Sequence, residues 1–140
     1  MASEFGAIGR MIRAEMDAHL VRLLWWSFAW FVAGLVLLYR ADEFRRGFAS
    51  LSAGWCVVNL IIVFFGFRDR TEPVLGQTRE FLAFNLGLNI AYMAVGITLV
   101  VLGADRGFQR GAGYAVLIQG LALLVLDGIL LSRLPSLAAR

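Results

Sequence analysis

Four long apolar runs, separated only by short charged segments, limit what this chain of 140 residues can fold into. The runs cover residues 23–39, 47–67, 81–103 and 111–131. Each is 17 to 23 residues long, and a helix of roughly 20 apolar residues crosses the ~30 Å hydrocarbon layer of a bilayer. The sequence therefore predicts an all-α protein, a bundle of four transmembrane helices that forms one integral membrane domain over residues 1–140.

Composition excludes several kinds of cofactor site. Hydrophobic residues make up 60% of the chain, far more than in a soluble domain. All 13 basic residues are arginine, so the chain lacks the lysine that a Walker-type phosphate loop, retinal or pyridoxal phosphate needs. The single cysteine, Cys56, and the single histidine, His19, rule out a CxxC metal site and a bis-histidine haem within one chain. We therefore expect no metal, no cofactor and, without a nucleophile–base pair, no enzyme activity.

Arginine counts predict the topology. The N-terminal segment, the second connection and the C-terminus hold eight arginines, and the first and third connections hold five. The positive-inside rule favours placing both termini in the cytoplasm, in a multi-pass protein of a cell inner (plasma) membrane. The net charge of +3 is spread over several connections, so it is a topology signal and not a nucleic-acid patch. The expected partners are the lipid bilayer and either further copies of this chain or other membrane proteins.

The segment before the first apolar run, residues 4–21, has an amphipathic pattern. At 100° per residue, one arc is apolar and the opposite arc is charged. The apolar arc holds Phe5, Ile8, Ile12 and Met16, and the charged arc holds Arg10, Arg13 and Asp17. This pattern predicts an interfacial helix that lies on the membrane. His19 sits at the apolar edge, where a hydrogen bond to Glu15 is the favoured interpretation and a ligand or proton-relay role is the alternative.

Polar side chains recur inside the last three apolar runs. Asn85, Asn89 and Tyr92 share one face of the third run, since they lie at i, i+4 and i+7. An aspartate within a transmembrane helix costs roughly 2.5–3.5 kcal/mol on insertion scales, so Asp127 is expected to face other helices or a cavity. We predict one intramembrane polar cluster of Asn59, Asn85, Asn89, Tyr92, Gln119 and Asp127.

Small residues predict where helices approach closely, because side chains without bulk let backbones meet. The predicted packing positions are Gly34, Gly87, Ala91, Gly96, Gly113 and Gly120. Gly87 and Ala91 lie on the face of the third run opposite its polar stripe. With two faces turned away from lipid, the third run is predicted to be the most buried helix, either in the middle of the bundle or at a subunit interface.

Three segments, Trp55–Leu60, Phe84–Gly96 and Gly111–Asp127, resemble an uncharacterised family of small four-span bacterial membrane proteins. That family's pattern has a Trp-Asn-x-x-Asn run, an Asn-x-Gly-Leu-Asp-x-x-Tyr run, and a Gln-Gly element followed by an Asp. This chain departs from it at Cys56, where the pattern has Asn, and at Asn89, where it has Asp. The second departure removes a carboxylate and weakens a proton-relay interpretation. The resemblance implies a membrane location and a four-span fold, and no activity.

Two functions fit the polar cluster. Interhelical hydrogen bonds in membrane proteins contribute about 0.6 kcal/mol each, so the amides and Asp127 would stabilise a scaffold or accessory subunit. The alternative is a small homo-oligomeric transporter or channel, in which the same groups form a site for an ion, a proton or a small solute. Pigment or lipid binding is a further alternative.

Overall fold

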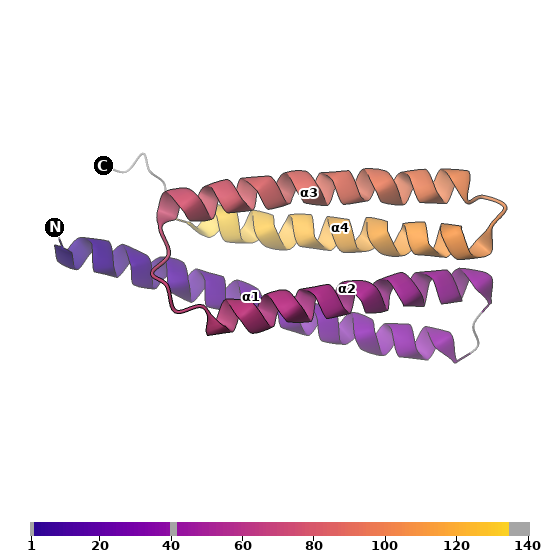
Figure 1. Ribbon diagram of the computed structural model, residues 1–140, viewed down its shortest axis with the longest axis horizontal. Helices are drawn as coiled ribbons and strands as arrows, with labels where there is room; N and C mark the ends of the chain where they lie inside the picture. The colour runs from indigo at the N-terminus through magenta and orange to yellow at the C-terminus, as the bar shows by residue number, and fades with distance from the viewer. Residues whose placement is uncertain (1, 40–41, 135–140) are drawn as a thin grey trace.

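The computed structural model describes residues 2–39 and 42–134, with side chains from residue 6 onward. The described residues form four α-helices, shown in Figure 1: α1 (Ala2–Leu38), α2 (Glu43–Arg68), α3 (Leu75–Leu102) and α4 (Gly107–Arg133). All four are long and apolar enough to cross a membrane. The protein is therefore an all-α, multi-pass membrane protein whose helices pack as a bundle, and each helix is longer than the apolar run that predicted it.

The bundle consists of two helical hairpins, α1–α2 and α3–α4 (Figure 1). α4 is the central helix, because it packs extensively against both α2 and α3. α3 packs almost entirely on α4, and its contacts with α1 and α2 are few. This arrangement leaves α2 and α3 apart on one side of the bundle, and the candidate site lies between them.

The predicted interfacial helix over residues 4–21 is wrong as a separate element. α1 is one continuous helix of 37 residues, about 55 Å long at ~1.5 Å per residue. Its apolar arc packs inside the protein: Ile12 is 1% exposed and contacts a cluster that includes Leu82 of α3 and Leu130 of α4. The ends of α3 and α4 therefore cover the arc that was expected to face lipid. The side chain of Phe5 lies outside the described residues.

The prediction that the third run is the most buried helix is also wrong. α3 has three buried residues and α4 has ten. Ala91 is exposed, and a Cβ added at Gly87 would meet no atom within 4 Å. A small-residue face needs no cover in a bilayer, because lipid chains are as apolar as a neighbouring helix. The middle-of-bundle alternative is thus contradicted for α3, and a subunit interface stays a prediction.

Glycines bring α3 and α4 into close contact. A Cβ at Gly96 would lie 2.8 Å from the backbone nitrogen of Leu117, and one at Gly113 would lie 2.8 Å from the carbonyl oxygen of Gly96. A Cβ at Gly120 would lie 2.9 Å from Cγ of Met93. Gly34 is buried but less tightly packed, since its Cβ would lie 4.0 Å from the nearest atom.

α2 and α4 also meet through glycines. Added Cβ atoms at Gly47 and Gly111 would overlap the backbones of Phe108 and Phe44. These glycines lie near the α1–α2 and α3–α4 connections, as do Gly96 and Gly113. Consequently, that half of the bundle is tightly packed, and the half nearer the α2–α3 connection is more open.

Candidate functional site: an intramembrane cavity

A cavity of about 730 Å³ lies between α2 and α3 and is walled by side chains from all four helices. One end of the cavity, which we call its mouth, is lined by Arg68, Asp69 and Thr78 at the α2–α3 connection. At the inner end, the rings of Trp55 and Tyr92 pack edge to face with centroids 4.9 Å apart. From residue 68 to residue 55, α2 rises about 20 Å. The cavity is thus an elongated space that runs along α2 and α3, from their connection into the interior of the bundle.

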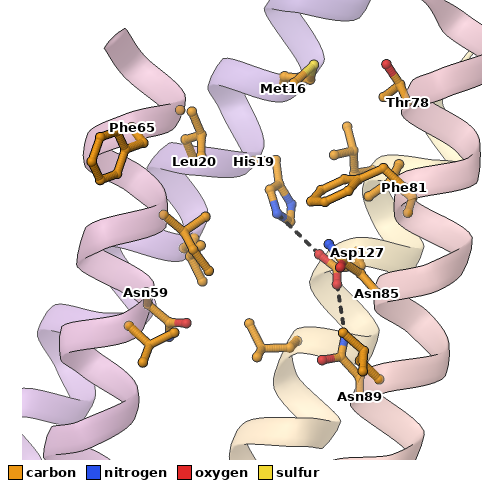
Figure 2. A pocket seen from close by; sticks show the side chains of 18 of the residues that line it. Met16, His19, Leu20, Asn59, Phe65, Thr78, Phe81, Asn85, Asn89 and Asp127 are labelled. Carbon is orange, nitrogen blue, oxygen red and sulfur yellow. Dashed lines mark hydrogen bonds and ion pairs between the residues drawn. The ribbon is translucent and has the colours of Figure 1, made fainter. Parts of the chain in front are cut away.

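One wall carries a chain of hydrogen-bonding side chains from three helices (Figure 2). Nδ2 of Asn89 donates a hydrogen bond of 2.8 Å to Oδ2 of Asp127. The other carboxyl oxygen, Oδ1, lies 3.3 Å from Nε2 of His19. All three residues are buried, with exposed fractions of 3%, 6% and 9%. Both oxygens of the intramembrane carboxyl group therefore have a partner, which offsets the cost of removing Asp127 from water.

The expected hydrogen bond between His19 and Glu15 is not formed. Oε2 of Glu15 lies instead 3.7 Å from the NH1 atom of Arg133. His19 reaches Asp127 because α1 continues without a break into the bundle. A sequence signal for this was present: His19 and Trp26 lie seven residues apart, so a single long helix would place both on the face turned toward α4.

Asn59 lies across the cavity from this chain (Figure 2). It is 1% exposed, and neither atom of its side-chain amide has a hydrogen-bond partner among the described residues. An unpaired buried donor or acceptor costs roughly 1–3 kcal/mol. Most buried polar groups in proteins are paired, so an exception of this kind needs an explanation. A bound molecule that supplies the missing partner would provide one.

The structure places five of the six predicted cluster residues on the cavity wall. These are Asn59, Asn85, Asn89, Tyr92 and Asp127. Gln119 is buried elsewhere, and its Oε1 accepts a hydrogen bond of 2.9 Å from Nε1 of Trp26. Gln119 therefore connects α4 to α1 rather than facing the cavity. His19, which was not predicted to belong to the cluster, is part of the wall.

The charged groups at the mouth have local partners. The guanidinium carbon of Arg68 lies 5.2 Å from the ring centroid of Phe64. Asp69 accepts hydrogen bonds from Oγ1 and the backbone nitrogen of Thr71, at 2.6 and 2.9 Å. The side-chain bond, followed by the backbone bond, lowers the pKa of Asp69 below its ordinary value. These contacts hold the two opposite charges at the α2–α3 connection, outside the apolar part of the cavity.

The donor set around the cavity does not resemble a metal site. Among residues 2–39 and 42–134, no group of three or more His, Cys, Asp and Glu side chains lies close enough together to hold a metal ion. Amides and aliphatic or aromatic side chains predominate on the wall. Such a wall suits an uncharged organic molecule better than an ion.

A family of unknown function, DUF6992, matches residues 22–128 of the chain. The protein belongs to the DUF6992 family. The DUF6992 match includes the amides of the cavity wall and Asp127, whereas His19 lies before it. No curated protein and no solved structure matches the chain. This family membership and the four candidate membrane spans agree with the resemblance to an uncharacterised four-span family. Because the function of DUF6992 is unknown, the match assigns no activity to the protein.

Proposed function

We propose that this protein is a membrane-embedded binding subunit whose cavity holds a small molecule that partitions into the bilayer. The observation that carries the proposal is the cavity itself. Its volume of about 730 Å³ falls within the roughly 300–1,000 Å³ range of small-molecule sites, which are apolar with a few convergent polar groups. A role as an accessory subunit, the leading prediction from the sequence, fits a protein that binds such a molecule without transforming it.

The shape of the cavity favours binding over transport. The cavity ends at Trp55 and Tyr92, and beyond them the helices meet through closely packed glycines such as Gly96 and Gly113. A channel or a transporter needs access from both sides of the membrane, which this packed half of the bundle obstructs. A homo-oligomeric transporter therefore stays a prediction with less support than a binding protein.

The wall also favours binding over catalysis. His19 and Asp127 form an acid–base pair, yet no serine or cysteine is among the described residues that line the cavity, and the hydroxyl of Thr78, at the mouth, donates a hydrogen bond to the carbonyl oxygen of Val74. A nucleophile within hydrogen-bond reach of the histidine would be needed for covalent catalysis. Within this proposal, both termini and the mouth of the cavity lie on the cytoplasmic side, as the arginine counts predict.

Two adjacent valines of α2 provide a matched test. Val58 lines the cavity and Val57 does not, although both are partly exposed, at 45% and 58%. Val58→Trp fills part of the cavity, and Val57→Trp adds the same side chain outside it. After mild detergent extraction, native mass spectrometry should detect a bound small molecule on the wild-type protein and on Val57→Trp, and lose most of it on Val58→Trp. No bound molecule on any of them, or equal amounts on both variants, would contradict the proposal.

A further inference from the structure

We infer that the cavity takes a neutral lipid whose polar group is a hydroxyl or a carbonyl, and that Asn59 binds this group. The inference rests on the proposed function, and it adds the chemical class of the ligand and the position of its polar end. Three features of the cavity carry it: the electrical neutrality of its wall, the unpaired amide of Asn59, and the depth at which that amide lies.

The interior of the cavity offers a ligand no net charge. Asp127 and His19 are adjacent to each other, so one proton held by either group makes the pair neutral overall, as an ion pair or as an uncharged acid and base, and without that proton the pair repels an anion. Arg68 and Asp69 carry opposite charges and stay at the mouth. Arg22, three residues after His19 on α1, carries a positive charge close to His19, but its side chain does not line the cavity. Inside the mouth, an anionic group would therefore find no free counter-charge among the residues that line the cavity, and burying an unpaired charge is far more costly than burying a hydroxyl.

Asn59 supplies the hydrogen bonds that a neutral polar group needs. A side-chain amide has two N–H donors and one carbonyl acceptor, and in Asn59 neither the nitrogen nor the oxygen has a partner among the described residues. A hydroxyl pairs with either end of the amide, and a carbonyl accepts from the N–H group. Asn85 and Tyr92 line the same space and add further neutral groups nearby.

The depth of Asn59 excludes a large polar headgroup. Asn59 precedes Arg68 by nine residues, so it lies about 14 Å along α2 from the mouth. The wall between these two positions includes the apolar side chains Ile62, Phe65 and Phe81. A phosphate headgroup would lose its hydration on that path without gaining a partner. A long-chain alcohol or a carbonyl-bearing lipid loses far less, and its apolar chain contacts the same wall.

Trp55 reports occupancy directly, because its ring lines the inner end of the cavity. The protein is reconstituted in phosphatidylcholine nanodiscs and titrated with three quenchers that share one dibrominated chain: octadecanol, ionised octadecanoate and phosphatidylglycerol. The signal to be measured is quenching of tryptophan fluorescence that saturates with quencher concentration. The part of it that comes from Trp55 is present in the wild-type protein and absent in Trp55→Phe. We expect the alcohol to saturate this component at a low mole fraction, and the two anionic probes to produce only the linear quenching of free diffusion.

Asn59→Leu should raise the half-saturating mole fraction of the alcohol about tenfold, the effect of losing one net hydrogen bond. Because leucine replaces an unpaired buried amide, this variant should fold at least as stably as the wild type. Ser52→Ala is the matched control: Ser52 is also buried on α2 without a partner for its hydroxyl among the described residues, but it does not line the cavity. The control should bind the alcohol like the wild type.

The outcomes separate the inference from the function that it refines. One contrary result is that octadecanoate or phosphatidylglycerol quenches Trp55 saturably at mole fractions as low as those of the alcohol. That result would overturn the neutral-lipid inference, but it would be consistent with the proposed binding function. Unchanged alcohol binding in Asn59→Leu would overturn the role of Asn59. Absence of saturable quenching with all three probes, together with no bound molecule in native mass spectrometry, would overturn both the inference and the proposed function.

Discussion

Asp127 shows how a single carboxyl group is accommodated inside a membrane bundle. Its two oxygens face partners from different helices, Asn89 of α3 and His19 of α1. Each partner is buried, with at most 9% of its surface exposed. The residue therefore connects three helices through one side chain, in addition to forming part of the cavity wall.

We expect Asp127→Leu to lose about 1–3 kcal/mol of folding free energy, since it leaves the amide of Asn89 without its buried acceptor. Asp127→Asn should lose much less, because an amide of the same shape can accept from Asn89 and face His19 with its NH₂ group. Thermal unfolding in detergent measures the difference. Equal destabilisation by both variants would mean that the charge of the carboxylate, rather than its hydrogen bonds, stabilises the bundle.

At the scale of the helices, glycines of α3 differ in whether another helix packs against them. Some lie in a contact within the bundle, and others lie on a face that no described helix of this chain covers. Gly96 of α3 lies against the backbone of α4, whereas Gly87, on the same helix, has open space beside it. Both positions were predicted to be packing glycines, because composition alone does not distinguish them. Only the direction in which each points relative to α4 sets them apart.

Gly96→Ala and Gly87→Ala form a matched pair on one helix. The added methyl group at position 96 would lie 2.8 and 2.9 Å from backbone atoms of α4, so the helices must separate, at a cost of about 1–3 kcal/mol. At position 87 the methyl group meets nothing, and alanine stabilises a helix by up to about 1 kcal/mol relative to glycine. Unfolding temperatures should therefore fall for the first variant and hold or rise for the second. A lower unfolding temperature for Gly87→Ala, in a sample that contains more than one copy of the chain per particle, would instead indicate a subunit interface at position 87.

For the whole molecule, the N-terminal half of α1 decides whether the cavity has a fourth wall. Met16, His19 and Leu20 line the cavity from α1, and Ile12 anchors this part of the helix against α3 and α4. An interfacial helix lying on the membrane would leave the cavity open on this side. The continuous helix therefore links the stability of the bundle to the shape of the site.

Ile12→Ala tests this link against its neighbour Met11→Ala. Ile12 is 1% exposed and Met11 is 47% exposed, and truncating a buried isoleucine typically costs about 2–5 kcal/mol. We expect a marked fall in unfolding temperature for Ile12→Ala, accompanied by loss of the molecule detected by native mass spectrometry, and little change for Met11→Ala. Similar behaviour of the two variants would indicate that this half of α1 lies outside the bundle.

Much of the fold and part of the candidate site followed from the sequence alone. The length of each apolar run predicts a membrane helix, because the thickness of the hydrocarbon layer and the helical rise per residue are both constant. Helical periodicity likewise places Asn85, Asn89 and Tyr92 on one face of α3. These properties are local, since they depend on residues within a few turns of one another.

The tertiary structure alone decided which faces meet. It paired His19 with Asp127 instead of Glu15, turned Gln119 toward Trp26, and separated α2 from α3 to form the cavity. In a bilayer, an apolar or small-residue face is compatible both with lipid and with another helix, so hydrophobicity does not select the neighbour. Which helices touch, and at what offset along their axes, depends on the packing of side chains far apart in the sequence.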